Sequence, residues 1–389
     1  MPQTRSLAAL SALVATYFAH IGFFNPYLPL WLKEMGLSLV AISVLVSLQS
    51  ASRLVAPYGW GWLSDHTGRR TWLLRYGAGA SLVISLGLWF DGGVVWLFAV
   101  LLLLFTHTSG MMPMAEALVI QNVSRDGQFD ARRYGHVRVF GSVGFLLTVI
   151  AAGWWFERHG MAQFPLLTLL TISAVAVSAW ALPSVRETVP AQEDKESVWP
   201  LLRQPSTQLF FTSAFFHVLA HISVYVFFSL YLDELGYSKT TIGLLWALSV
   251  LVEVVWFFTQ ARWLPRFAPT VWLMICAAVM VVRMLITAGA GEQLWALMLA
   301  QSMHAITFAA HHTVCVTWLS QRFPGQMRGR AQAIYTIVAY GLPGVLGGLA
   351  GGVLSSHWGL VSVFWISMPV ALLSLLAAWG AWRMDRDSS

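Results

Sequence analysis

Long apolar stretches recur along the chain, and each lacks every Asp, Glu, Lys and Arg residue. They cover 92–115, 159–185, 204–232, 293–321 and 331–382. An α-helix rises about 1.5 Å per residue, so about 20 apolar residues cross the hydrocarbon core of a bilayer. The last stretch is too long for one crossing and divides near Ser355-Ser356-His357. Because the stretches are continuous rather than alternating, they exclude a membrane β-barrel.

Shorter apolar runs between isolated charges supply the remaining crossings. The pattern predicts an all-α membrane protein with twelve transmembrane helices. Their expected ranges are 6–32, 38–63, 71–90, 94–122, 134–156, 161–182, 207–232, 239–261, 269–289, 293–320, 330–354 and 359–382.

The composition excludes a soluble protein and several kinds of partner. Hydrophobic residues make up 57% of the 389 residues and charged residues 10%, whereas soluble domains average about 25% charged residues. Cys276 and Cys315 both lie inside apolar segments, which gives neither a disulfide framework nor a metal quartet. We therefore expect no metal and no cofactor. The net charge of +6 follows from the placement of the arginines and requires no nucleic acid.

The basic residues indicate the orientation in the membrane. Most of the 23 Lys and Arg residues fall in alternate loops that share one side, and Lys33, Arg158 and Lys239 fall on the other. Positive charge is retained in the cytoplasm, so both termini are expected there, in a multi-pass protein of the cytoplasmic (inner) membrane. The first residues lack a cleavage-site pattern, which predicts that 6–32 is a retained span.

An internal repeat divides the chain into two halves. Residues 30–38 align with 230–238 at an offset of about 200 positions, which also places Arg53 over Glu253. We predict two pseudo-symmetric six-helix halves, 1–182 and 206–389, joined by a polar cytoplasmic linker, 183–205. Internal repeats of this kind are typical of transporters that bind their substrate near the bilayer midplane.

A short motif follows the second predicted helix. Gly61, Asp65, Gly68, Arg69 and Arg70 match the loop signature G-x-x-x-D-[RK]-x-G-[RK]-[RK] in type, and His66 departs from it. The segment resembles the signature of the major facilitator superfamily, which implies the major facilitator fold and a conformational latch at these residues. The alternative is an ordinary basic loop on the cytoplasmic side.

Charged residues inside the predicted spans need a reason, because each costs about 2.5–3.5 kcal/mol near the bilayer centre. Glu116 and Arg138 lie near the same membrane edge on consecutive helices, so they can face each other. The segment Tyr134-Gly-x-x-Arg138-x-x-Gly resembles the lactose-permease-like sugar symporters. That resemblance implies substrate binding or gating by Glu116 and Arg138. The alternative is a structural ion pair between two helices.

The second half carries a further polar group. Arg283 and the Gln301-Ser-Met-His304 stretch also resemble the sugar symporters, but Thr307 replaces their acidic proton carrier. Nearly the whole chain resembles the phenylpropionate permeases, most specifically over 236–254. This implies proton-linked uptake of small aromatic acids. Glu253 is the acidic residue deep in this half and is expected to carry the proton. The expected sites are, for substrate, Glu116, Arg138, His20, His221, His304 and Arg283, and, for proton coupling, Glu253, Glu116, Arg283 and His304.

The histidines permit another interpretation. His217 and His221 form an H-x-x-x-H pattern, and His311-His312 is a pair. Membrane di-iron enzymes use such groups, but they need about eight ligands and do not have twelve spans. His217 and His221 share a helix face, as His304 and His311 would. We expect a polar cavity lining, although single histidines can simply bond neighbouring helices.

Two further features have structural as well as functional interpretations. The glycines between 341 and 352 favour close helix packing or a gating hinge. Several aromatic residues are able to stack on a substrate ring, namely Tyr17, Phe24, Tyr27, Tyr225, Trp246 and Trp256.

The sequence therefore predicts a secondary transporter, not an enzyme, that works by alternating access. The main hypothesis is a proton symporter that imports a small organic acid, with an aromatic acid favoured. The alternatives are a sugar or nucleoside symporter, an efflux transporter, or a membrane di-iron enzyme. The expected partners are a small-molecule substrate, protons and the lipid bilayer, and the chain is expected to be monomeric.

Overall fold

The computed structural model describes residues 2–124, 130–183, 197–325 and 327–387. Residues 184–196 of the predicted linker lie outside this part, and so does Arg125. The chain divides into two compact units. Unit 1 holds 1–37, 51–191 and 238–247, and unit 2 holds 38–50, 192–237 and 248–389. α2 and α10 therefore contribute to both units.

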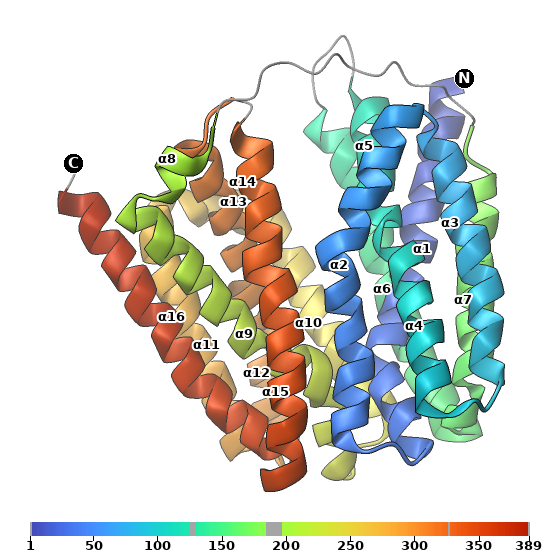
Figure 1. Cartoon of the computed structure of the whole chain (residues 1–389). Coiled ribbons are helices and arrows are strands. Elements are labelled where there is room, and N and C mark those ends of the chain that lie inside the picture. Colours follow the sequence, from blue (N-terminus) through green and yellow to red (C-terminus); the bar gives the residue numbers. More distant parts are fainter. Residues whose placement is uncertain (1, 125–129, 184–196, 326, 388–389) are drawn as a thin grey trace. The chain divides into compact units, whose positions relative to one another are not determined.

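Unit 1 is built from long helices. They are α1 (Pro2–Glu34), α2 (Leu39–Thr67, from residue 51), α3 (Arg70–Ser85), α4 (Gly93–Ser109), α5 (Met111–Val123), α6 (Ala131–His159) and α7 (Phe164–Trp180), with short 3₁₀ turns η1 (Leu86–Trp89) and η2 (Met161–Gln163). α1 packs against α5, α6 and α7, and α3 packs against α4, α5 and α7 (Figure 1). The start of α10 (Lys239–Thr259) completes the unit.

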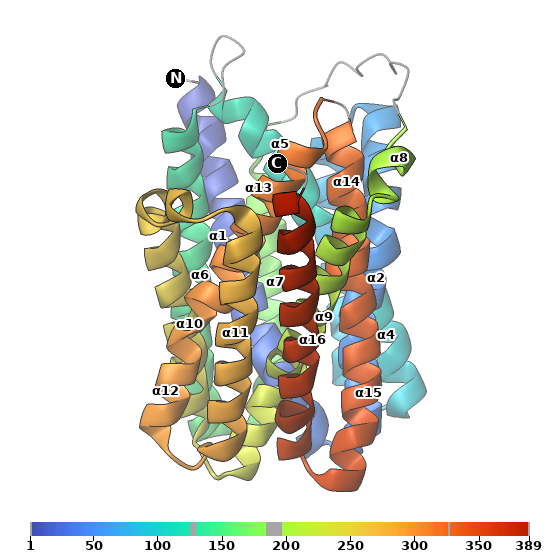
Figure 2. The ribbon, with the colours of Figure 1, turned by 90° about the vertical axis from the view of Figure 1, so that its left-hand side faces the viewer.

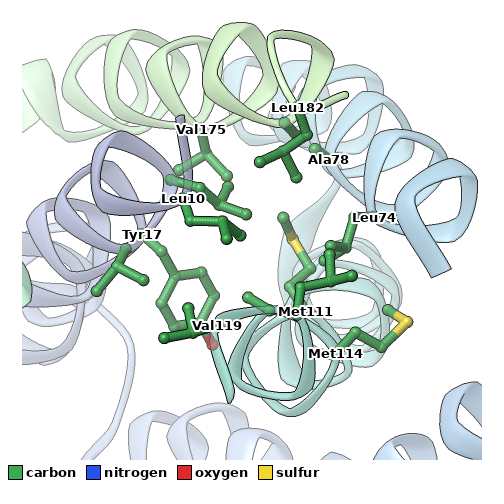
Figure 3. Close-up of a cluster of buried hydrophobic side chains, with 14 of the residues drawn as sticks. Leu10, Tyr17, Leu74, Ala78, Met111, Met114, Val119, Val175 and Leu182 are labelled. Carbon is green, nitrogen blue, oxygen red and sulfur yellow. The ribbon is translucent and has the colours of Figure 1, made fainter. Parts of the chain in front are cut away.

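The core of unit 1 is a cluster of apolar side chains from five helices, α1, α3, α5, α6 and α7. Leu10 and Tyr17 of α1 meet Leu74 of α3, Met111 of α5 and Val175 of α7 (Figure 3). All five are buried. The remaining apolar faces stay exposed in the isolated chain, as expected for a protein whose helices face lipid.

Unit 2 contains the other helices. They are α8 (Trp199–Leu202), α9 (Pro205–Glu234), α10 from residue 248, α11 (Pro269–Gly289), α12 (Leu294–Ser302), α13 (His311–Arg322), α14 (Met327–Tyr335), α15 (Leu342–Trp358) and α16 (Val361–Asp387). The short turns are η3 (Gln260–Arg262), η4 (Leu264–Arg266), η5 (Ala305–Ala310) and η6 (Thr336–Gly341). α16 packs against α9 and α11, and α9 also contacts α15 (Figure 2).

Ten helical stretches among the described residues are long and apolar enough to cross a membrane. The fold class is therefore confirmed as all-helical, with no strand in the described ranges. The predicted spans 71–90 and 293–320 are also helical but interrupted. α3 ends at Ser85 and continues as the 3₁₀ turn η1, and η5 separates α12 from α13. The count of twelve stays a prediction.

Two helices of unit 2 contain π-helical turns, in which the hydrogen bonds reach one residue further than in an α-helix. η5 joins α12 to α13, and η6 joins α14 to α15. Both turns lie inside predicted spans, 293–320 and 330–354, whose helices they interrupt. The π turn η5 also changes the angular spacing that would have placed His304 and His311 on one face.

The internal repeat appears in two turns with the same geometry. Gly36 and Gly236 have φ of 82° and 83°, in the left-handed region that favours glycine. Their amides donate to the carbonyls of Lys33 and Asp233 at 2.9 and 3.1 Å. Gly160 and Gly359 form a second matching pair, with φ of 78° and 79°. Equivalent turns in the two halves thus fold alike although most of their side chains differ.

The glycines of α15 allow a close approach to the start of α2, and both segments belong to unit 2. A Cβ atom on Gly352 would overlap Ser43 Oγ, and one on Gly348 would overlap Ser47 Oγ. The interpretation of these glycines as packing residues therefore agrees with the contacts. The turn η6 lies immediately before them.

Candidate functional site

Arg283 is the centre of a buried polar cluster in unit 2. It lies on α11, and its side chain is 1% exposed. Nη1 donates to Thr307 Oγ1 at 2.8 Å and approaches His221 Nε2 at 3.2 Å and His304 Nδ1 at 3.3 Å. Nη2 donates to Gln301 Oε1 at 2.9 Å. Three helices, α9, α11 and the interrupted helix 294–322, thus converge on one guanidinium group.

All of these acceptors are neutral groups. Within the described part of the chain, no carboxylate lies within ion-pair distance of Arg283. Gln301 Oε1 also accepts a hydrogen bond from Ser249 of α10, so its amide is fixed on two sides. The cluster solvates the cation with dipoles, and no described carboxylate contacts it directly.

His304 connects Arg283 to Glu253. A guanidinium group only donates, so His304 Nδ1 must accept from Arg283, and the proton of the neutral ring then lies on Nε2. Nε2 faces Glu253 Oε2 at 3.5 Å. Arg283 and Glu253 are thus joined in a three-residue chain with His304 in the middle. The Glu253 side chain remains 22% exposed.

Aromatic rings surround the cluster in two stacked pairs. His221 stacks on Tyr225 with ring centroids 4.7 Å apart, and His304 stacks on Phe308 at 5.0 Å. The two histidine rings meet edge to face. Tyr225 and Phe308 are only partly buried, whereas both histidines are buried. Each stacked pair thus joins a buried histidine that bonds Arg283 to a partly exposed aromatic ring.

His217 and His311 form a second layer in the same unit. Their rings stack at a centroid distance of 3.8 Å, and His217 Nε2 donates to the Thr307 carbonyl at 2.7 Å. His311 lies against the Cys315 thiol. Among the described residues, no group of three or more His, Cys, Asp or Glu side chains is arranged to hold a metal ion.

The predicted pair of unit 1 is in contact. Arg138 Nη1 lies 3.4 Å from Glu116 Oε2, and Tyr134 Oη donates to the other carboxylate oxygen. The Arg138 guanidinium group also lies over the Phe18 ring. Both charged side chains are partly exposed, at 39% for Arg138 and 27% for Glu116. In this pair the opposite charges are in direct contact, whereas no described carboxylate contacts Arg283 directly.

His20 is buried in unit 1 and bonds Thr171 Oγ1 of α7 at 3.0 Å. Its ring packs against Phe23 and Phe24. The hydrogen bond of His20 therefore joins α1 to α7. Its described contacts do not include the Glu116–Arg138 pair, and its substrate role stays a prediction.

The aromatic residues singled out from the sequence take different positions. Tyr225 belongs to the Arg283 cluster, and Tyr17 and Tyr27 donate their hydroxyl groups to backbone carbonyls. Phe24 lies in a buried aromatic group, and Trp256 meets Trp272 edge to face. The sequence did not assign Thr307 its bond to Arg283 or Phe308 its stacking on His304. Their spacing of three and four residues after His304 was the available signal.

The motif at the end of α2 is more helical than predicted. α2 continues to Thr67 instead of ending at residue 63, and Gly68, with φ of 60°, ends it. Arg70 donates to Ser64 Oγ through Nε and pairs with Asp65 at 3.4 Å. Asp65 remains largely exposed, and Gly61 has open space on its side-chain side.

Comparisons with known proteins agree on the class of molecule. Residues 7–366 match the family model described as MFS_1 like family. The chain is 27% identical over 366 residues to a probable 3-phenylpropionic acid transporter of Escherichia coli, covering 92% of this chain and 93% of that protein. It is 27% identical over 355 residues to a maltose permease of Geobacillus stearothermophilus, covering 89% and 87%. A crystal structure of a variant of the nucleoside transporter NupG superimposes with a TM-score of 0.83 at 15% identity, covering 97% of this chain and 99% of that one.

Proposed function

The chain belongs to the MFS_1 like family, and we propose that it is a secondary transporter that imports a small aromatic acid together with protons by alternating access. Membership of a transporter family is the premise. The substrate class, the proton coupling and the direction are our proposal. They rest on the chemistry around Arg283 and on the relatives described above.

The observation that carries the proposal is that the buried Arg283 has only neutral groups in direct contact among the described residues. Burying an ion is costly by several kcal/mol even after relaxation. A guanidinium group held in this way is retained at a cost in stability, which is the usual mark of intramembrane ionisable groups with a function. A substrate carboxylate would give Arg283 a direct anionic partner.

Arg283 can accept such a carboxylate by exchanging partners. Nη1 carries two hydrogens but has three neutral acceptors within reach: Thr307 Oγ1, His221 Nε2 and His304 Nδ1. Charge-assisted, bidentate bonds to a carboxylate are stronger than bonds to neutral groups. A bound acid would therefore displace the histidines first, because their bonds are the longest.

The surrounding rings favour an aromatic substrate. Tyr225 and Phe308 are the partly exposed members of the two stacked pairs. Aromatic rings pack well edge to face or offset-stacked, so the ring of an aryl acid would fit against these residues while its carboxylate reaches Arg283. The similarity to a probable 3-phenylpropionic acid transporter supports the same substrate class.

The chain Glu253–His304–Arg283 provides a means of coupling. When Arg283 bonds His304 Nδ1, the ring has its proton on Nε2 toward Glu253. A substrate carboxylate that replaces His304 as a partner of Arg283 leaves His304 Nδ1 free to accept a proton. Substrate binding and protonation of the His304–Glu253 pair would then favour each other. Glu253 is the proposed proton carrier and His304 the proposed relay.

The other predicted roles complete the proposal. Glu116 and Arg138 would act in substrate binding or gating in the first half, and Gly61, Asp65, Gly68, Arg69 and Arg70 would form the conformational latch. We further propose twelve spans in two six-helix halves, both termini in the cytoplasm, the inner membrane as location, and a monomer as the working form.

A ligand panel tests the proposal. Purified protein in detergent is heated with 3-phenylpropionate, benzoate, maltose or uridine, because a ligand at about one hundred times its Kd stabilises by about 2.7 kcal/mol. We expect stabilisation by the aromatic acids, and none in Arg283→Met. Stabilisation by maltose or uridine alone would overturn the substrate assignment.

A sugar symporter is the second candidate, because the chain resembles a maltose permease as closely as the phenylpropionate relative in identity. The partly exposed pair Glu116–Arg138 is the feature that favours it, since this pair carries the sugar-symporter resemblance. Maltose-dependent stabilisation that survives Arg283→Met but fails in Glu116→Gln would support this candidate.

A further inference from the structure

The helix that carries His304 and Thr307 is not regular. α12 ends at Ser302, the π-helical turn η5 covers Ala305–Ala310, and α13 starts at His311. The amide of His311 donates to Ile306 O, five residues back, as expected for one inserted residue. Single π turns of this kind are rare and occur frequently at functional sites. Such a turn needs contacts that favour it over the regular α-helix.

His217 of α9 provides two such contacts. Its Nε2 donates to the carbonyl oxygen of Thr307, inside the turn, and its ring stacks on His311, just after the turn. The side chain is 1% exposed. A carbonyl only accepts, so the proton of the neutral His217 ring lies on Nε2. Nδ1 has no hydrogen-bond partner in the described structure, which leaves the contact with Thr307 as the polar role of this ring.

The same turn fixes two groups on Arg283. Thr307 Oγ1 accepts from Nη1 at 2.8 Å, and His304, one residue before the turn, accepts from the same nitrogen. Relaxation to a regular helix would rotate the residues after the turn by about 100° relative to those before it. A spacing of three residues lets His304 and Thr307 share a face of a regular helix as well. The π turn therefore sets the rotation of Thr307 and the following residues relative to His304, and with it the distances of both groups to Nη1.

We propose that His217 is a positioning residue, which holds η5 in the register that presents Thr307 and His304 to Arg283. The inference rests on the proposed function for its effect on transport, but not for its structural claim. His217 does not contact the guanidinium group itself among the described contacts. It acts through the Thr307 backbone, and it thereby sets both the carboxylate site and the relay to Glu253.

Two substitutions separate its two contacts. His217→Gln keeps an N–H donor near the position of Nε2 and loses the stacked ring. His217→Phe keeps a ring against His311 and loses the donor. If the hydrogen bond to Thr307 holds the turn, His217→Phe is the damaging change and His217→Gln restores much of the wild-type behaviour.

The first measurement is hydrogen exchange of the amides of 306–311 in ligand-free protein. We expect exchange about tenfold faster in His217→Phe than in wild type, because a buried carbonyl has lost its partner, and near-wild-type exchange in His217→Gln. Equal exchange in all three proteins would overturn the positioning role, whatever the substrate is.

The second measurement is the binding of 3-phenylpropionate and its uptake. We expect a weaker apparent affinity, by about tenfold, in His217→Phe, with recovery in His217→Gln. If wild type binds no aromatic acid, the proposed function fails while the exchange experiment still decides the positioning role. If His217→Phe changes exchange but leaves affinity and pH-driven uptake unaltered, the link between the turn and Arg283 is wrong.

Discussion

Replacing Arg283 by Met should leave the protein folded and abolish binding of aromatic acids. The substitution removes a buried charge and keeps an unbranched apolar side chain of similar reach. A purely structural arginine and a substrate-binding arginine respond in opposite ways, so the stability of the variant is as informative as its activity.

The expected stability follows from the contacts. The change removes hydrogen bonds from a charged donor to Thr307, His221, His304 and Gln301, each with a net contribution of about 1.5–3 kcal/mol. It also removes the desolvation cost of a buried ion, which is several kcal/mol. The two terms oppose each other, and Gln301 keeps its bond from Ser249. We therefore expect a Tm within a few degrees of wild type.

The expected loss of binding is much larger. A carboxylate held by two charge-assisted hydrogen bonds gains about 3 kcal/mol or more, since each is worth about 1.5–3 kcal/mol. At about 1.4 kcal/mol per factor of ten, the affinity should fall more than a hundredfold.

The assay compares Tm and ligand-induced shifts for wild type, Arg283→Met and a control, Arg262→Met. Arg262 is an exposed residue of η3 in the same unit, so the control loses the same charge at the surface. A large drop in the ligand-free Tm of Arg283→Met would assign Arg283 a structural role. Retained binding of 3-phenylpropionate by this variant would refute the carboxylate site.

Three further outcomes are expected. Glu253→Gln mimics a permanently protonated carrier, so counterflow exchange in proteoliposomes should persist while pH-driven accumulation is lost, and accumulation that persists would exclude Glu253 as the carrier. Single neutralisation of Glu116 or Arg138 should abolish transport and the double variant Glu116→Gln/Arg138→Gln should not restore it, whereas near-normal uptake by the double variant would make the pair structural. Gly352→Ala should lower the Tm by overpacking against Ser43, at a cost of about 1–3 kcal/mol. Adding Ser43→Gly to this variant should restore the Tm. An unchanged Tm in Gly352→Ala would show that α15 and the start of α2 separate easily at this contact.

The sequence alone predicted the class of fold because hydropathy is a local property. An apolar run of sufficient length has to satisfy its backbone internally in lipid, and a helix does so without help from other segments. The ranges 269–289 and 205–234 show this, since the structure places α11 and α9 there within a few residues of the prediction. The repeat was also visible, because the turns at Gly36 and Gly236 require the same backbone conformation.

The pairing of Glu116 with Arg138 was predictable for a related reason. Both residues lie near the same edge of the membrane on consecutive antiparallel helices. Their depth in the membrane and the packing of their two helices therefore follow from the order of the chain. The contact at 3.4 Å agrees with that reasoning. Whether the pair serves transport does not follow from the contact.

The environment of Arg283 was decided only by the tertiary structure. The sequence placed Arg283, His304 and Glu253 on three different predicted helices, but hydropathy does not fix how each helix is rotated about its axis. Packing fixes those rotations, and it places His304 between the other two residues. The π turn at 305–310 then changes the rotation within a single helix, because His217 of a distant segment binds the Thr307 carbonyl. Such a contact depends on two helices meeting, which no local pattern in either of them specifies.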